Sequence, residues 1–481
     1  MNPAMARPPA RRGWMVMLVA MLAACALLGG GRSLAAAATG VAGADPPPGA
    51  HLAGTPGGLR MQFVAPVESP FVVLEFWQDG RVASLPARID PTDPQAVIAA
   101  MRHGAGRPGQ AWVRYRVLTG DGHVVGGRYT VQVGTGGPGV APPAQLTSAG
   151  GAWLTGVGRG LVLAGLVIAL GLVVLRWVVA GPDWQAGGVV APGHADESEG
   201  FRGRTLTALT RGAGTWWAAW WSALAAWLIG AVLIGIGVCW WLGVGASGLG
   251  TLLAHTRTGH AVDLLVAIVA VTALVALLLG RRTDADRPDV SLGWGVALGV
   301  GAAAGLMVMS WQGHASDGTD VSINIAADAI HAIATAAWIG GLVGLLVLVV
   351  GPAQDLPTDD RVRLLAGAVV RFSSLAIAAV SVLVITGTYR ALAELSSLSQ
   401  LVTTGYGIAL TVKLAIFAVM LVAGGYSRTV LHPRLERTAL GLDADERGAS
   451  RALRASLRAE LVLAASLMVA VAVLVAMTPP G

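Results

Sequence analysis

The chain has 481 residues, of which 54% are hydrophobic and only 12% are charged, and it contains 66 glycines. This composition is typical of a membrane protein with several spans rather than of a water-soluble globular protein. The formal net charge is +6, but the arginines lie mainly between the apolar runs, so the charge does not indicate a nucleic-acid partner. The two cysteines, Cys25 and Cys239, exclude a CxxC metal or redox motif.

The N-terminus has the pattern of a secretory signal. Three arginines among the first twelve residues precede an apolar run, 14–28, and small residues follow that run. This order is typical of a signal peptide. The A-x-A triplet at 42–44 predicts that residues 1–44 are removed, and the alanines at 35–38 offer a competing cleavage site. Even if the leader stayed as an anchor, the domain that follows it would lie outside the membrane.

A small β domain is predicted next, over residues 45–137. Segments 59–63, 112–117 and 128–131 alternate apolar and polar residues with the period of two that a half-buried strand requires. The pattern favours a small antiparallel sandwich of the Ig-like or Greek-key type. Residues 138–152 are rich in glycine and proline and are interpreted as the tether to the rest of the chain.

Residues 153–481 are predicted to form an eight-helix transmembrane domain. A hydrocarbon core of roughly 30 Å needs about 20 apolar residues per helix, and backbone groups in lipid must be satisfied within each span. The fold class is therefore mainly α, with a polytopic bundle behind a small all-β domain. The eight predicted spans are 153–178, 216–242, 261–280, 291–311, 323–350, 373–392, 406–427 and 459–477.

The distribution of arginine predicts the orientation. With the β domain outside, four loops face the cytoplasm, and these loops carry most of the arginines, whereas the outer loops carry few. We therefore expect a multi-pass protein of the plasma (inner) membrane with an extracytoplasmic N-terminal domain. The four arginine-rich loops are 179–215, 281–290, 351–372 and 428–458.

Several titratable side chains lie at the outer ends of the predicted spans. Asp328 and His331 are three residues apart, as are His260 and Asp263, so each pair shares one helix face. His314 follows the fourth span. A carboxylate or imidazole inside a span is costly and normally marks an ion or substrate path. This reasoning favours a function for Asp328 and His331, whereas a lone histidine is more often a solvated interfacial side chain.

Two methionines precede His314 on the fourth predicted span. Imidazole suits copper and zinc, and neighbouring thioethers select for Cu(I). Met307 and His314 are seven residues apart, hence on one face if the helix continues, and Met309 lies between them. Ordinary core filling is the competing interpretation for both methionines. Lys413 lies within the seventh span, where it could be a counter-ion of a buried carboxylate or a side chain that reaches the interface.

One segment of the β domain carries two possible metal ligands, Asp121 and His123. On an extended strand, residues two apart project to one side, as two ligands of one ion must. The competing interpretation is a turn in which Asp121-Gly122 supplies only the backbone geometry.

Motifs in both parts of the chain resemble known families. Residues 115–118, the Asp-Gly-His segment 121–123 and residues 127–131 resemble the closing strands of CopC-like copper-binding domains, and 63–67 resembles an early strand. The membrane part resembles the copper-resistance D (CopD) family nearly throughout, so the chain is similar to fused CopC–CopD proteins, a group that includes copper importers. The CopD-like motifs are Gly313-His314-Ala315, His331 with 337–342, 371–373, 386–387, 404–407 with Lys413, and 460–461.

This resemblance implies a copper site in the head. In CopC-like domains Cu(II) is held by a mature N-terminal histidine together with the aspartate and histidine of the Asp-Gly-His segment, which carries over to Asp121 and His123. His51 is the candidate for the third ligand, although the region after it is shorter than the family pattern. His103 is an alternative source of an imidazole.

We therefore expect a copper-binding protein, not an enzyme, that captures extracytoplasmic copper and transports it through the bundle. Because no ATP-binding loop is recognisable, movement would follow a gradient. The expected partners are copper as Cu(I) or Cu(II), the lipid bilayer and an extracytoplasmic copper chaperone. The alternatives are a membrane redox protein that binds haem through two axial histidines, and a copper buffer or sensor that transports nothing. The predicted bundle site combines His314, His331 and Asp328 with Met307, Met309, His260 and Asp263 as secondary candidates.

Overall fold

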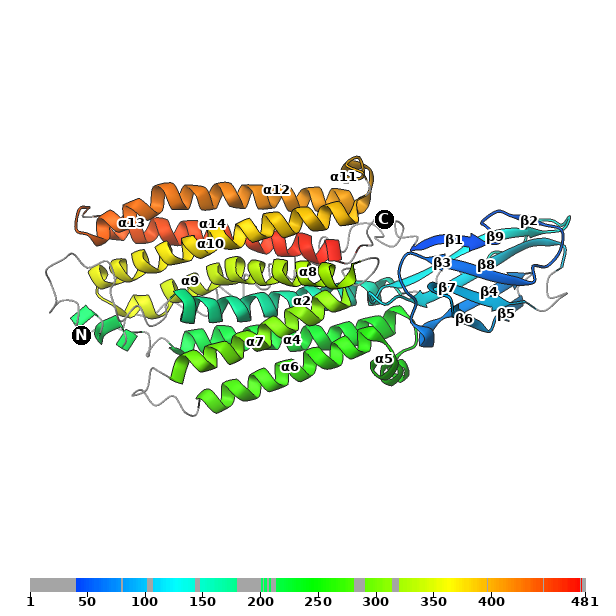
Figure 1. The fold of residues 1–481 in the computed structure, drawn as a ribbon, viewed down its shortest axis with the longest axis horizontal. Coiled ribbons are helices and arrows are strands. Elements are labelled where there is room, and N and C mark those ends of the chain that lie inside the picture. Colours follow the sequence, from blue (N-terminus) through cyan, green and yellow to red (C-terminus); the bar gives the residue numbers. More distant parts are fainter. Residues whose placement is uncertain are drawn as a thin grey trace, which may run out of the picture.

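The protein consists of a β domain, here called the head, at one end of a long helical bundle (Figure 1). The computed structural model describes residues 40–78, 81–101, 107–142, 148–179, 200–201, 203–205, 207–208, 213–280, 290–313, 320–395, 397–443, 445–475 and 477.

The head is a sandwich of two mainly antiparallel sheets, as the alternating segments predict. Inward residues of β3 and β8, such as Met61 and Val113, are fully buried, whereas their neighbours along each strand are not. One sheet has the order β1 (Val41–Asp45), β3 (Gly58–Phe63), β7 (Asp93–Ala100) and β6 (Ala87–Asp90). The other has the order β2 (His51–Leu52), β9 (Val124–Val133), β8 (Gly109–Leu118), β4 (Val73–Gln78) and β5 (Arg81–Ser84).

The head begins earlier than the predicted boundary at residue 45. β1 starts at Val41 and pairs with β3, with Ala44 opposite Met61 and Asp45 opposite Arg60. Cleavage after residue 44 would remove nearly all of this edge strand. At the other boundary, the first membrane helix begins at Ala149 with the Ser148 hydroxyl as its N-cap, so the tether is shorter than predicted.

Among the residues that the structure describes, eight helices are long and apolar enough to cross a membrane, and each coincides with a predicted span. The chain is therefore a multi-pass membrane protein. The spanning helices are α2 (Ala149–Val174), α4 (Ala213–Trp241), α6 (Arg257–Gly280), α7 (Val290–Gln312), α8 (Val321–Thr335) continued by α9 (Gly341–Val350), α10 (Thr358–Glu394), α12 (Gly405–Tyr426) and α14 (Glu446–Val475).

Helix α2 lies at the centre of the bundle and packs against α4, α7, α8, α9 and α14. Small residues permit this packing. A Cβ on Gly158 would lie 2.8 Å from the Gly230 carbonyl oxygen of α4, and one on Gly171 would lie 2.2 Å from the backbone of Gly340. Close backbone approach through small residues is how membrane helices associate without a hydrophobic driving force between them.

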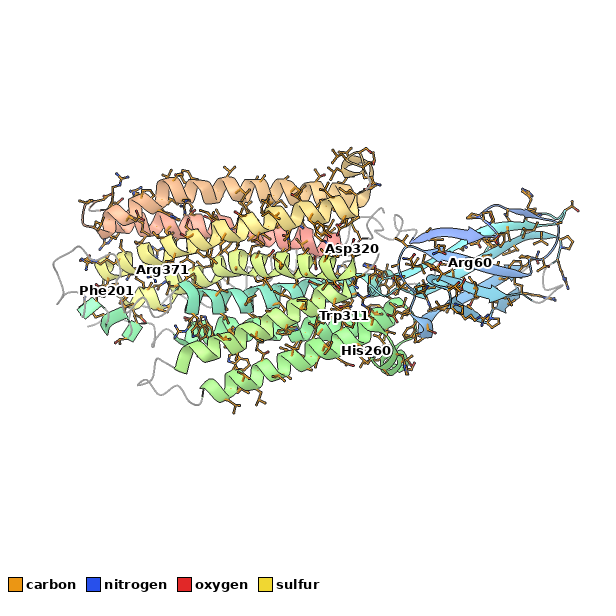
Figure 2. All side chains as sticks on the ribbon, viewed as in Figure 1. Arg60, Phe201, His260, Trp311, Asp320 and Arg371 are labelled. Atoms are coloured by element: carbon orange, nitrogen blue, oxygen red, sulfur yellow. The ribbon has the colours of Figure 1, made fainter. Side chains whose placement is uncertain are left out.

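The described arginines of the predicted cytoplasmic loops lie at the end of the bundle opposite the head. Figure 2 shows Arg371 at that end, while His260 and Trp311 lie next to the head. At the same far end Arg204 donates a hydrogen bond to Asp360 at 2.6 Å. The head and the arginine-rich ends are thus separated by the length of the spans.

Candidate functional site

A cavity of about 210 Å³ opens among α2, α7, α8, α10, α12 and α14 at the end of the bundle that carries the head. Its wall is largely apolar, but it contains charged and metal-affine side chains from all six of these helices. The described residues of that kind are Arg159, Met309, Asp328, His331, Arg390, Glu394, Tyr406, Lys413 and Met468.

The imidazole of His331 is held in one tautomer by a neighbouring hydroxyl. Nδ1 lies 2.9 Å from the Thr386 Oγ1 atom, and that hydroxyl donates its only proton to the Val382 carbonyl at 2.7 Å. The hydroxyl must therefore accept from Nδ1–H, which leaves the lone pair of the imidazole on Nε2. An orienting partner of this kind is what a metal-binding histidine requires.

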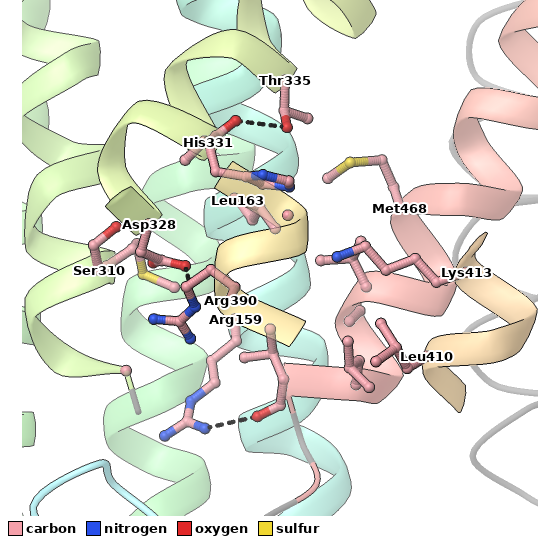
Figure 3. A pocket seen from close by; sticks show the side chains of 18 of the residues that line it. Arg159, Leu163, Ser310, Asp328, His331, Thr335, Arg390, Leu410, Lys413 and Met468 are labelled. Atoms are coloured by element: carbon pink, nitrogen blue, oxygen red, sulfur yellow. Dashed lines mark hydrogen bonds and ion pairs between the residues drawn. The ribbon is translucent and has the colours of Figure 1, made fainter. Parts of the chain in front are cut away.

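Two thioethers share the cavity with this imidazole. Met309 of α7 was predicted as a secondary candidate, whereas Met468 of α14 was not. Figure 3 shows the side chains of His331, Met468 and Lys413 pointing toward the same space. Sequence reasoning missed Met468 because α14 carries no other metal-affine residue near it. In the sequence, Met468 stands out only as a methionine on the buried face of a span.

Three charged side chains of the cavity, Asp328, Arg390 and Glu394, form a paired network. Arg390 Nε lies 3.9 Å from Asp328 Oδ1, and Arg390 also pairs with Glu394, one turn along α10. The Tyr406 hydroxyl donates to the other Glu394 oxygen. Asp328 thus faces an arginine, so a cation in this cavity depends on imidazole and sulfur donors more than on charge attraction.

Three other bundle candidates, Met307, His260 and Asp263, do not line this cavity. Met307 is 45% exposed on the outer surface of the bundle, and both His260 and Asp263 are exposed on α6. His260 Nε2 lies 3.3 Å from the Ala254 carbonyl oxygen instead. Met307 points away from the face that Met309 presents inward, because residues two apart on an α-helix differ by about 200° in direction. His314 lies outside the described residues.

In the head, Asp121 and His123 lie in the turn between β8 and β9, as the turn interpretation predicts. The Thr119 amide donates to the His123 carbonyl at 2.8 Å, and Gly122 has φ +75°, which favours glycine. The two side chains nevertheless face each other, with His123 Nε2 4.0 Å from Asp121 Oδ2. Two ligands of one ion at about 2.0–2.2 Å each can span that distance.

The structure separates His51 from this pair. β2 pairs in parallel with the last residues of β9, with His51 opposite Gln132, whereas His123 precedes the first residue of β9. At about 3.3 Å per residue this places His51 roughly 30 Å from the turn. His51 therefore cannot complete a site with Asp121 and His123 in this arrangement. His103 lies outside the described residues.

In the part of the chain that the structure describes, neither candidate site contains a complete set of hard or borderline ligands. Within the described ranges, no group of three or more His, Cys, Asp or Glu side chains is arranged to hold a metal ion. Of the histidines that the structure describes, only His331 lines the cavity, so this part of the chain does not supply the second axial imidazole that the haem alternative requires.

These features define a class: a polytopic helical membrane protein with a β-sandwich head and, beneath it, a cavity that contains charged and metal-affine side chains. Residues 41–134 match the family model of the CopC domain, and residues 366–474 match the family model of copper resistance protein D. The chain therefore fuses a CopC domain to a membrane domain with a copper resistance protein D region, as the resemblance predicts.

A curated relative and two solved structures are similar to parts of the chain. The copper transport protein CutJ of Bacillus subtilis (strain 168) is 31% identical over 119 residues, which is 25% of this chain and 21% of that protein. The match thus spans about a fifth of the curated relative. CopC from Methylosinus trichosporium OB3b is 22% identical over 21% of this chain and 97% of that one, with a TM-score of 0.18. PcoC, a methionine rich copper resistance protein from Escherichia coli, is 19% identical over 19% of this chain and 95% of that one, with a TM-score of 0.17.

Proposed function

We propose that the protein binds copper at its extracytoplasmic head and carries it through the bundle toward the cytoplasm. Copper is the transported substrate in this proposal, and no covalent reaction is assigned to the protein. The observation that carries the proposal is the cavity near the head, in which the Nε2 lone pair of His331 and the thioethers of Met309 and Met468 line one space.

The donor set suits copper better than the hard cations. Imidazole and thioether ligands select Cu(I) and tolerate Cu(II), whereas Mg²⁺ and Ca²⁺ prefer several oxygen ligands. Few neutral donors also suit transport, because an ion that is bound by a complete ligand cage leaves slowly. The CopC domain and the CutJ relative, which is named as a copper transport protein, support the same metal.

The inward direction of copper transport and the extracytoplasmic position of the head are inferred from the distribution of arginine among the loops. Arginine concentrates in the loops at the end of the bundle far from the head, in the positive-inside pattern. A copper chaperone on the outer side would deliver its ion to the head. A leader cleaved among the alanines at 35–38 would leave β1 intact, and mass spectrometry of the mature N-terminus tests that position.

Uptake of labelled copper into proteoliposomes tests the proposal, with the metal supplied in each oxidation state. We expect His331→Ala to lower the uptake by about 10-fold or more, the loss typical of disturbed metal ligation. His260→Ala is the matched control, because His260 lies at the same end of the bundle but outside the cavity. Equal uptake by His331→Ala and the unmodified protein would contradict the cavity assignment.

The same preparation separates the alternatives. Copper that binds in fixed proportion to the protein without crossing the bilayer would favour a buffer or sensor. A Soret absorption band that disappears in His331→Ala would favour the haem protein. Neither outcome is expected from a copper carrier.

A further inference from the structure

The Asp-Gly-His turn of the head is docked on the bundle in the structure. Arg159 of α2, which is 6% exposed, lies against it: its Nη1 is 3.2 Å from His123 Nε2, and its Nη2 donates to the Asp121 carbonyl at 2.7 Å. Trp241 of α4 packs edge-on against the His123 ring at 6.2 Å between centroids. Asp121 and His123 are 2% and 5% exposed as a result.

The hydrogen bond from Arg159 uses the nitrogen that a metal would need. A guanidinium has donors and no acceptor, so His123 Nε2 must accept with its lone pair. The same nitrogen faces Asp121 Oδ2 at 4.0 Å, and a metal ion shared by the two residues would bind to that lone pair. A cation there would also lie beside the permanent positive charge of the guanidinium, which repels it.

We propose that docking of the head and metal binding at Asp121 and His123 exclude each other. Copper that binds to the turn displaces Arg159 and releases the head, and departure of copper lets Arg159 return and the head dock again. This inference rests on the proposed function, because it takes the turn as the copper-binding part of the head.

The docked guanidinium also lines the cavity. Arg159 lines the cavity and lies 3.5 Å from the Val475 carbonyl oxygen at the end of α14, as the dashed line in Figure 3 marks. One side chain therefore contacts the turn of the head on one side and the cavity on the other.

The docking surface is built for reversible contact. A Cβ on Gly122 would lie 2.6 Å from Arg159 Nη2 and 2.7 Å from the Thr258 hydroxyl, so the turn fits only as glycine. The Thr258 hydroxyl and both polar atoms of the Gln312 amide are buried there without a hydrogen-bond partner among the described residues. Buried polar groups without partners cost free energy, and undocking returns them to water.

A second contact reports docking without touching the metal donors. The Arg257 amide at the start of α6 donates to the Glu68 carboxylate of the head at 3.0 Å. Burial at this contact raises the pKa of Glu68. Because the Arg257 amide makes this hydrogen bond only to the docked head, its hydrogen exchange, followed by mass spectrometry on the full chain, measures whether the head is docked.

The test combines this exchange measurement with titration of Cu(II), followed by electron paramagnetic resonance. In the unmodified protein we expect Cu(II) to accelerate exchange at Arg257. Arg159→Gln should accelerate it without metal and should tighten Cu(II) binding by about 10-fold, the worth of one hydrogen bond to a charged group. Arg159→Lys, which retains the charge but not the paired donors, serves if Arg159→Gln folds poorly.

Glu68→Ala distinguishes docking from a direct effect on the ligands. It removes the contact with Arg257 but does not touch Asp121 or His123, so tighter Cu(II) binding in this variant arises through release of the head. Arg81→Ala, exposed at the end of the head far from the bundle, is the control and should change neither measurement.

Two results would overturn the inference and separate it from the proposed function. If Cu(II) binds with no change in hydrogen exchange at the Arg257 amide, and Arg159→Gln and Glu68→Ala bind it no more tightly, docking and metal binding are independent. Copper uptake that persists alongside this result would leave the proposed function standing. If Asp121→Asn and His123→Ala leave Cu(II) binding to the full chain unchanged, the turn does not hold the metal, and the head's part in the proposed function fails as well.

Discussion

At the scale of single residues, the chemistry of the cavity depends on contacts between side chains far apart in the sequence. The spacing of Asp328 and His331 predicts that they share one helix face and point into the bundle, and both line the cavity. The spacing contains no information about Thr386, which comes from a different helix and sets the tautomer of the imidazole.

Thr386→Val should therefore weaken copper binding in the cavity. Valine has the shape of threonine but cannot accept the proton of Nδ1, so the ring loses its fixed tautomer and orientation. We expect the apparent affinity for transported copper to fall by about 10–100-fold, the usual effect of removing an orienting partner. Thr386→Ser retains the hydroxyl and should behave as the unmodified protein in the proteoliposome assay. Equal losses in both variants would assign the effect to packing.

A surface carboxylate of the head gives a prediction about pH. Hydrogen bonds from the Thr92 amide and hydroxyl, and then from Arg60, lower the pKa of Asp90 from 3.8 to about 2. A carboxyl whose pKa is lower in the folded head than in the unfolded chain stabilises the head at a pH above its unfolded pKa. This stabilisation disappears as the pH falls through the pKa of the folded head. Asp90→Asn should lower the unfolding temperature of the head above pH 4, and the difference from the unmodified protein should shrink as the pH falls toward 2 and vanish below it. A constant difference across this range would exclude the ionised carboxylate as its cause.

At the scale of secondary structure, apolar length predicted the existence of every span, because lipid leaves the backbone no other hydrogen-bond partners. It did not predict where helices extend into water. α10 begins at Thr358 and α14 at Glu446, well before the apolar runs, because their polar first turns pack at the end of the bundle opposite the head. Nor did it predict the π-helical turn Ala336–Gly340 that follows the helix bearing His331.

This π-helical turn lies against the centre of α2, and Gly340 makes the contact possible. A Cβ there would lie 2.1 Å from the Val167 carbonyl oxygen. Gly340→Ala should therefore force the two helices apart and destabilise the bundle by about 1–3 kcal/mol, as overpacking does. Thermal unfolding in detergent measures the change. Gly425→Ala is the matched control, since nothing lies within 4 Å of its added Cβ, and it should be neutral.

At the scale of the whole molecule, the predicted orientation places the head and the arginine-rich loops on opposite sides of the membrane. Cysteine labelling in intact spheroplasts tests this, in a protein whose Cys25 and Cys239 are replaced by serine. A cysteine at Arg81 in the head should react with an impermeant maleimide. One at Leu442, which is 73% exposed between α13 (His432–Ala439) and α14, should react only after lysis. The reverse pattern would contradict the proposed topology.

The sequence by itself determined the fold class, the eight spans, the β-sandwich head and the CopC and copper resistance protein D motifs, because periodicity and apolar length are local properties of the chain. It also determined that Asp328 and His331 face inward. Only the tertiary structure decided that Met468 and Thr386 lie beside His331, whereas Met307, His260 and Asp263 do not. It also decided that His51 lies at the end of the head far from Asp121 and His123, and that Arg159 lies against His123. These facts depend on which helix faces pack together and on strand register across the sandwich, and neither is encoded in the spacing of residues along one element.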